Sequence, residues 1–421
     1  MVNIESILEN LKDGEFDQVS KHINEIKYNG TEEEILELAE GCLHYGFVDE
    51  AKSLYEHLLE IYPEEGELMV SIAEILTEMD REDEAILLLE KVSPEDPAYP
   101  SALLLEADLY QMQGMDEVSE RKLLTAKEIL PEEIIIDFAL GELYYQQAKF
   151  FEALQSYKKV IQQEKELSGV NMNQRIADAL SSVGQFEEAL PYFEKALEEK
   201  LEINLLFEYG FTAYQAGYYG TAVEKFTELK NLDPEYHSLY LYLAKSYEQQ
   251  NDLDQALASA KEGIKQDEFN KELCHFAGKI ALKKGLEEEA EFFFKEALAL
   301  DPGFMETALN LLKLYLHQEK YEEILEVISS VQQYGEYDPQ FDWILAVSHQ
   351  KLENYTEAVR FFAEAFPQFK DNQDFLEEYG YFLIEEGKNK DAVEIFKRLV
   401  EMQPANDEYI MTLERLNDRL E

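Results

Sequence analysis

Apolar residues recur along the chain at three- and four-residue spacing, in stretches that short polar breaks separate. This spacing places the apolar side chains on one face of an α-helix, because a helix completes a turn about every 3.6 residues. Glycine supplies the break in many units, at Gly46, Gly114, Gly184, Gly217, Gly285 and Gly387. The pattern therefore predicts an all-α chain built from pairs of amphipathic helices that tight turns connect.

The helix pairs repeat with a period of 34 residues. One position after each predicted turn usually holds a small residue. This position is occupied by Val19, Ala51, Ala85, Ser119, Ala153, Ala189, Ala222, Ala256, Ala290, Ile324, Ala358 and Ala392. A second column of mostly small residues, such as Gly141 and Gly278, lies twelve residues earlier. A third column, four residues after the first, is mostly large and apolar, as at Tyr157 and Phe294. Small residues let two helices approach closely, and bulky ones fill the space between neighbouring pairs.

Proline follows the second helix of many units, as at Pro63, Pro131, Pro234, Pro302 and Pro404, because it cannot continue a helix. Position for position, the pattern resembles the tetratricopeptide repeat over about residues 1–406, most clearly in the unit 271–304. It resembles in particular the acidic multi-repeat proteins of this family from Gram-positive bacteria. The resemblance implies a right-handed superhelical solenoid of about twelve helix-turn-helix units.

Two places depart from the repeat. Ser168 and Gly169 form a two-residue insertion between the fifth and sixth units, where the closing proline is missing. Pro191 falls inside a predicted second helix, where proline costs about 3 kcal/mol or bends the helix axis. We expect a bend near residue 169 that separates an N-terminal array, residues 1–169, from a C-terminal array, residues 170–406.

The two ends of the chain are predicted to cap the array. Residues 1–30 form a degenerate first helix pair, and residues 407–421 form an amphipathic capping helix that covers the last apolar face. Because an incomplete cap leaves an apolar face open, self-association through the end units stays open as an alternative.

The balance of charge and the lack of long apolar runs limit the partners. The 37 Lys and Arg residues stand against 90 Asp and Glu residues, which gives a formal net charge of -53 and disfavours binding to nucleic acid or anionic membranes. No apolar run approaches the ~20 residues of a membrane helix, so we expect no membrane insertion. The first residues lack the features of a secretory signal, which favours a cytoplasmic location.

Motifs for catalysis are missing from the sequence. The seven histidines show no metal-binding spacing, and the two cysteines, Cys42 and Cys274, are interpreted as small buried residues. Glycine-rich phosphate loops and nucleophile motifs are also missing. We predict no enzyme activity, no metal and no cofactor.

The family resemblance implies a concave groove, lined by the first helix of each unit, that binds a protein or a peptide. One groove position is acidic in the N-terminal half, at Glu40, Glu74, Asp108, Glu142 and Asp178. The same position is basic further along, at Lys245, Lys279 and Lys313. Neighbouring groove positions extend this basic half with His275, Lys283, Asn310, His317, Trp343 and Lys351. Candidate apolar groove residues are Phe138, Tyr145, Phe207, Phe211 and Tyr214.

The change of sign along the groove suggests two kinds of partner segment. The basic half suits an acidic or C-terminal carboxylate segment, and the acidic half suits a basic or amphipathic helix. A solvated face of an acidic protein and aromatic packing in the core remain alternative interpretations of these residues. The sequence predicts an interaction scaffold or adaptor, with a peptide-sensing regulatory receptor as the alternative and an enzyme subunit least favoured.

Overall fold

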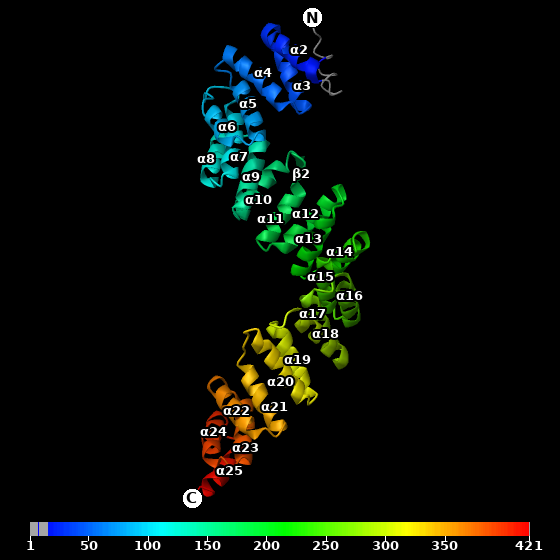
Figure 1. The fold of residues 1–421 in the computed structure, drawn as a ribbon, viewed down its shortest axis with the longest axis vertical. Coiled ribbons are helices and arrows are strands. Elements are labelled where there is room, and N and C mark those ends of the chain that lie inside the picture. Colours follow the sequence, from blue (N-terminus) through cyan, green and yellow to red (C-terminus); the bar gives the residue numbers. More distant parts are fainter. Residues whose placement is uncertain (1–6, 8–15, 421) are drawn as a thin grey trace. The chain divides into compact units, whose positions relative to one another are not determined.

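A computed structural model describes residue 7 and residues 16–420 of the chain, and the regular secondary structure of this part is almost entirely helical (Figure 1). First and second helices alternate. The first helices are α3 (Glu32–His44), α5 (Gly66–Glu78), α7 (Tyr99–Met112), α9 (Ile134–Gln146), α11 (Met172–Ser182), α13 (Ile203–Gln215), α15 (Ser238–Gln249), α17 (Lys271–Lys283), α19 (Met305–His317), α21 (Gln340–Lys351) and α23 (Gln373–Glu385). The second helices are α4 (Val48–Ile61), α6 (Glu82–Leu89), α8 (Asp116–Ile129), α10 (Phe150–Val160), α12 (Phe186–Glu199), α14 (Tyr219–Leu232), α16 (Leu253–Gln266), α18 (Glu287–Leu300), α20 (Tyr321–Gln333), α22 (Tyr355–Phe369) and α24 (Asn389–Met402). The predicted all-α repeat architecture is confirmed.

The chain forms two compact units, Met1–Leu205 and Leu206–Glu421, and the boundary between them in the sequence falls inside α13. Within each unit, helices make most of their contacts with the next or next-but-one helix along the chain. The predicted division after residue 169 lies inside the first unit, and a bend there stays a prediction.

The two ends of the array differ in how fully they are described. At the N-terminus, α2 (Phe16–Asn29) precedes α3, and most of the first helix predicted within residues 1–30 lies outside the described residues. At the C-terminus, α25 (Asp407–Asp418) buries Tyr409 and Leu416 against the apolar core of the last helix pairs.

A residue in the left-handed backbone conformation connects the two helices of every complete pair in the described part of the chain. Each glycine that the sequence predicted at a turn has φ between 72° and 82°. Where a helix pair has no glycine at its turn, the same position is taken by Asp80, Ala148, Asn251, Glu319 or Glu353, with φ between 56° and 62°. At the first such turn the amide of Gly46 donates to the carbonyl of Leu43, and the amide of Phe47 donates to Cys42. This hydrogen-bond pattern ends a helix by satisfying its last carbonyls.

Proline marks the end of second helices as predicted. Residues that cap the C-termini of α4, α8, α14, α18 and α24 directly precede Pro63, Pro131, Pro234, Pro302 and Pro404. Pro191 lies on an exposed position inside α12, and the helix continues through it to Glu199.

The columns of small and large residues pack against each other within each pair. Tyr157 and Phe294 are fully buried. A Cβ atom added to Gly141 would lie 2.5 Å from the Tyr157 ring, and one added to Gly278 would lie 2.6 Å from the Phe294 ring. The bulky ring of the second helix therefore occupies the space that the small residue of the first helix leaves free.

The insertion at Ser168 and Gly169 forms a feature that the sequence pattern did not predict. Strand β1 (Glu166–Leu167) pairs with strand β2 (Val170–Asn171) in an antiparallel hairpin. Ser168 and Gly169 are its two-residue turn, with φ of 52° and 77°. Positive φ at both turn residues suits the twist of a hairpin, so the extra residues are absorbed between α10 and α11 without lengthening either helix.

Candidate functional site

Two adjoining cavities lie on the first helices near the end of the second unit. The first cavity, about 370 Å³, is lined by Lys313, Leu316, Tyr321, Gln340, Trp343, Ile344, Val347 and Glu378. The second cavity, about 690 Å³, is lined by Trp343, Val347, Gln350, Lys351, Asp374, Glu377, Glu378, Tyr381 and Phe382. Both volumes fall within the range of about 300–1,000 Å³ that is usual for ligand pockets. Trp343, Val347 and Glu378 line both cavities, so the two are one continuous candidate site.

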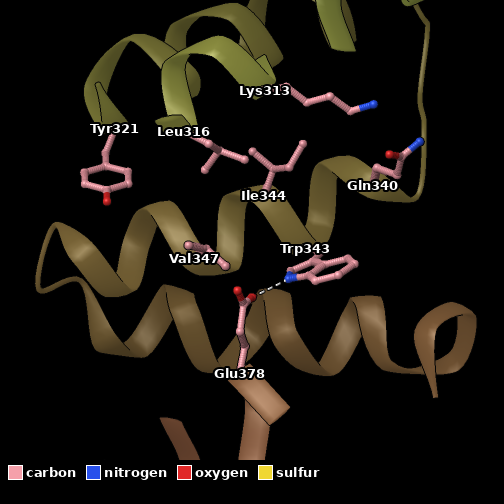
Figure 2. A pocket seen from close by; sticks show the side chains of 8 residues that line it. All are labelled: Lys313, Leu316, Tyr321, Gln340, Trp343, Ile344, Val347 and Glu378. Carbon is pink, nitrogen blue, oxygen red and sulfur yellow. Dashed lines mark hydrogen bonds between the residues drawn. The ribbon is translucent and has the colours of Figure 1, made fainter. Parts of the chain in front are cut away.

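Trp343 is the aromatic centre of this site. Its Nε1–H donates a 2.7 Å hydrogen bond to Oε2 of Glu378, which Figure 2 shows with Trp343 on α21 and Glu378 on α23. The indole packs against Phe369 and Phe375, with ring centroids 5.2 and 5.4 Å away. Packing on one side and a hydrogen bond on the other hold the ring in one orientation while part of it stays exposed.

Three carboxylates face the second cavity from α23. Asp374, Glu377 and Glu378 lie three and four residues apart, which places them on one side of the helix. Desolvation raises the pKa of Glu378, and repulsion from the other two carboxylates raises it further, while the Trp343 hydrogen bond and Lys351 oppose the change. The second cavity therefore carries more negative than positive charge.

Three of the predicted basic groove residues lie at the two cavities: Lys313 at the first, Lys351 at the second, and Trp343 at both. Lys313 extends above Gln340 and Trp343 in Figure 2. Asn310 lies half-buried on α19, nearly one turn before Lys313. These residues lay at separate positions in the sequence pattern, and the structure brings Lys313, Trp343 and Lys351 to one site.

Other predicted cations contact acidic residues of neighbouring helices. Lys283 pairs with Glu248, Lys279 lies 3.4 Å from Glu306, and Nε2 of His317 lies 3.7 Å from Glu287. The basic half of the groove is therefore partly neutralised by acids about one repeat away in the sequence. Lys245 instead lies over the ring of Tyr242, 5.4 Å from its centroid.

His275 is buried between α17 and α19. Its Nδ1 shares a 2.8 Å hydrogen bond with the Thr307 hydroxyl, and its Nε2 lies 3.2 Å from Glu306. Desolvation lowers the pKa of His275, although the nearby carboxylate of Glu306 opposes the change. The side chain thus joins two first helices.

The predicted apolar groove residues in the second unit form a ring cluster with Tyr242. The ring centroids of Phe207 and Phe211 are 6.3 Å apart, and Tyr242 lies 4.9 Å from Phe211 and 5.9 Å from Tyr214. These rings are half-buried and pack between α13 and α15.

The two aromatic candidates of the first unit lie on α9. Tyr145 contacts Phe150 with centroids 5.3 Å apart, and Phe138 is half-buried. Each therefore contributes to packing while keeping part of its ring exposed.

The predicted acidic residues lie in the first unit. Glu40, Glu74 and Asp108 are exposed, and Asp178 is half-buried. Desolvation raises the pKa of Glu74, and the charge of Glu78 raises it further.

Glu142, the remaining acidic candidate, is held by two partners. It accepts a 2.6 Å hydrogen bond from the Tyr157 hydroxyl and forms an ion pair with Arg175 at 2.9 Å. Glu142 thus connects three helices, α9, α10 and α11.

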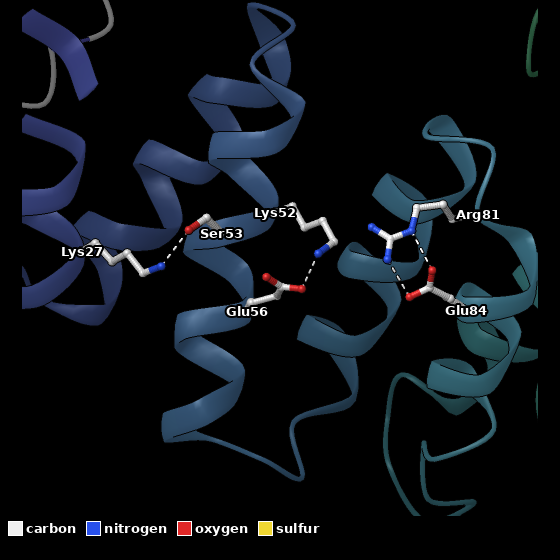
Figure 3. Close-up of polar contacts among 6 residues, drawn as sticks. All are labelled: Lys27, Lys52, Ser53, Glu56, Arg81 and Glu84. Carbon is white, nitrogen blue, oxygen red and sulfur yellow. Dashed lines mark hydrogen bonds and ion pairs between the residues drawn. The ribbon is translucent and has the colours of Figure 1, made fainter. Parts of the chain in front are cut away.

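A smaller cavity, about 310 Å³, lies against the second helices α4 and α6 of the first unit. Two of the cations that line it, Lys52 and Arg81, pair with Glu56 and Glu84, as Figure 3 shows. Its charges are thus largely balanced within the cavity, which makes it a weaker candidate for recognising a charged partner.

The described residues lack the features that a metal site, a membrane-spanning helix or a reactive cysteine requires. Among them, no group of three or more His, Cys, Asp or Glu side chains is arranged to hold a metal ion, and no helix is long and apolar enough to span a membrane. Burial raises the pKa of Cys42 to about 12 and that of Cys274 to about 11, so neither thiol is activated as a nucleophile.

Four family models of tetratricopeptide repeats match five segments of the chain. The model described as YpiA-like tetratricopeptide repeats matches residues 111–165, and the model for YpiA-like C-terminal tetratricopeptide repeats matches residues 339–406. General tetratricopeptide-repeat models match residues 45–114, 170–202 and 271–304. The match over residues 339–406 contains α21 and α23, which carry most of the two cavities.

The chain is 47% identical over 374 residues to the TPR repeat-containing protein YpiA of Bacillus subtilis (strain 168), covering 89% of this chain and 88% of that protein. It is 21% identical over 257 residues to the CTR9 homolog of Arabidopsis thaliana, covering 58% of this chain and 23% of that protein. Similar solved structures include YrrB, described as a TPR protein with an unusual peptide-binding site, with 20% identity, a TM-score of 0.38, and coverage of 47% of this chain and 97% of that chain. The Cut9–Hcn1 hetero-tetramer matches with 11% identity, a TM-score of 0.36, and coverage of 99% of this chain and 96% of that chain.

Proposed function

We propose, from the premise that the chain belongs to the YpiA-like tetratricopeptide-repeat family, that it is a scaffold or adaptor that binds a segment of another protein at the two cavities of its second unit. The family is built from helix pairs that present their first helices to a partner, and its members are typically not catalytic. No enzymatic role is proposed for this chain. The cytoplasmic location stays a prediction from the sequence.

The position of Trp343 is the observation that carries this proposal. A half-exposed indole that packing and a hydrogen bond already hold in place loses little side-chain entropy when a partner covers it. Tryptophan is also enriched among the residues that contribute most to protein–protein binding. The cavities on both sides of the ring offer space for the side chains of an extended or helical segment.

The acidic residues of the first unit support a weaker proposal, which is a second contact of the same partner through a basic segment. Glu40, Glu74 and Asp108 are exposed, whereas Glu142 is already paired with Arg175. Because exposed charge pairs contribute only about 0.2–1 kcal/mol each, this contact would add to binding at the cavities and would not replace it.

Affinity capture from cell extract with three forms of the full chain tests the proposal. These forms are the wild type, Trp343→Ala, and the matched control Phe292→Ala, which removes another exposed aromatic ring of the second unit from a second helix. We expect the wild type and Phe292→Ala to capture the same partner and Trp343→Ala to lose it, with circular dichroism showing that all three are folded. Capture of identical proteins by all three forms would count against the cavities as the binding site.

The captured material also separates the scaffold or adaptor role from the regulatory alternative. A folded partner protein favours a scaffold or adaptor, and a short peptide that copurifies favours the alternative, a peptide-sensing receptor. Mass spectrometry of the intact captured species distinguishes the two.

A further inference from the structure

The first cavity is suited to a large apolar side chain. Leu316, Ile344 and Val347 form much of its wall, together with the indole of Trp343 and the ring of Tyr321. The polar side chains of Lys313, Gln340 and Glu378 complete the lining. Figure 2 shows Leu316 and Ile344 pointing toward each other across the space between α19 and α21. Burying a Leu, Phe or Met side chain in such a site removes its apolar surface from water, so this cavity would anchor the partner.

The second cavity has a different chemistry. Asp374, Glu377 and Glu378 line it, opposed by the single ammonium group of Lys351. Next to it, the Tyr381 hydroxyl donates a 2.7 Å hydrogen bond to another carboxylate, Glu408 of α25. The negative charge therefore continues from α23 to α25, beyond the cavity itself.

Aromatic faces stand beside these carboxylates. Trp343 and Tyr381 both line the second cavity. The face of an aromatic ring attracts a cation, and Arg can in addition donate hydrogen bonds to carboxylates. An acidic segment would instead place its carboxylates against those of α23.

We infer that the two cavities together recognise a segment in which a large apolar side chain is followed or preceded closely by Lys or Arg. The apolar side chain enters the first cavity, and the cation enters the second cavity among Asp374, Glu377 and Glu378. This inference rests on the proposed function and adds the chemical class of the partner segment. It departs from the acidic segment that the basic half of the groove suggested, because Lys279 and Lys283 already pair with acids of this chain.

Selection from a display library of random 12-residue peptides tests the inference. The full-length wild type serves as bait, and peptides that also bind Trp343→Ala or Val347→Arg are removed. Trp343→Ala removes the shared wall, and Val347→Arg fills the cavities while keeping the indole in place. We expect the remaining peptides to carry Phe, Leu or Met within two residues of Lys or Arg.

Fluorescence then measures the affinity of the selected peptides, because Trp343 is the only tryptophan of the chain. The variant Asp374→Asn/Glu377→Gln is compared with the matched control Glu401→Gln/Glu414→Gln, which neutralises two exposed acids on α24 and α25. We expect the first variant to bind roughly 2- to 25-fold more weakly and the control to bind like the wild type. Replacing the Lys or Arg of the peptide by Gln should weaken binding to the wild type by a similar factor. The same replacement should not weaken binding to Asp374→Asn/Glu377→Gln any further.

The outcomes separate this inference from the proposed function. Selected peptides that need Trp343 but are acidic or uncharged would overturn the inference and leave the proposed function standing. Peptides that need Trp343 but bind Asp374→Asn/Glu377→Gln as tightly as the wild type would do the same. A selection that yields no peptide dependent on Trp343 and Val347 would overturn both.

Discussion

Gly278 offers a quantitative test of how the helix pairs pack. It lies in α17 opposite Phe294 of α18, whose ring is fully buried. In Gly278→Ala, the new Cβ would lie 2.6 Å from Cδ1 and Cε1 of that ring and 3.1 Å from Cζ. Real carbon atoms do not approach so closely, and the buried ring has no route to solvent, so the two helices must separate or the ring must leave its rotamer.

The expected size follows from two opposing effects. Overpacking a core by one methyl group costs about 1–3 kcal/mol. Replacing glycine by alanine within a helix gains about 1 kcal/mol. We therefore expect Gly278→Ala to lower the free energy of unfolding by about 1 kcal/mol, and by about 2 kcal/mol if the ring does not adjust.

Urea unfolding followed by circular dichroism measures the change, with Gly220→Ala as the matched control. Gly220 lies near the start of α14, where an added Cβ meets only the Gln250 side chain at 3.7 Å, so the same substitution should stabilise the chain slightly. The double variant Gly278→Ala/Phe294→Leu should be less destabilised than the sum of its two single variants. If Gly278→Ala stabilises the protein as much as Gly220→Ala does, the explanation of the small column by close packing is wrong.

Three further predictions concern two turns and a half-buried glutamate that is paired with two lysines. Glu319→Gly should raise the free energy of unfolding by about 0.5–1 kcal/mol in thermal unfolding, because Glu319 has φ of 57° and glycine adopts this conformation without strain; a loss of stability would contradict this. Burial opposes ionisation of Glu291, but hydrogen bonds from two lysines and Tyr315 outweigh it and lower its pKa from 4.5 to about 2. The stabilising effect of the Glu291 carboxylate is thus complete above about pH 4.5 and is lost as the pH falls toward 2. Glu291→Gln should therefore lower the free energy of unfolding by about 1–2 kcal/mol at pH 7 and by almost nothing near pH 2, as measured by urea unfolding at each pH. An equal loss at both pH values would refute this role of Glu291. Gly169→Ala should cost about 1 kcal/mol and speed amide exchange in the β1–β2 hairpin alone, since Gly169 has φ of 77° with open space around it.

The repeat was predictable because its causes are local in sequence. A glycine such as Gly46 marks a turn, and a proline such as Pro302 marks the end of a second helix, since each restricts the backbone of its own residue. Turns without glycine, such as the one at Ala148, were predictable only from the period, because alanine itself gives no turn signal. The pair of Ser168 and Gly169 was recognised as an insertion, but its hairpin depends on the pairing of two very short strands.

The candidate site was predictable only in part, because its charges depend on contacts between repeats. Lys313, Trp343 and Lys351 were identified from their groove positions, and the structure places all three at the cavities. Lys279 was interpreted as part of a basic stripe, but Glu306 on the next first helix lies 3.4 Å from it. The sequence signal for the acidic side of the site was present on α23 at Asp374 and its neighbours, but these residues lie outside the groove position at which the charge changes sign.

The contacts of each helix with its nearest neighbours along the chain limit how far a bound partner can act. A segment that contacts α19, α21 and α23 at once would stabilise three successive repeats against local unfolding. Amide exchange should slow in those repeats and in the helices beside them, whereas more distant repeats should keep the exchange rates of the free protein. The repeats in which amide exchange slows would thus show where along the chain the partner is bound.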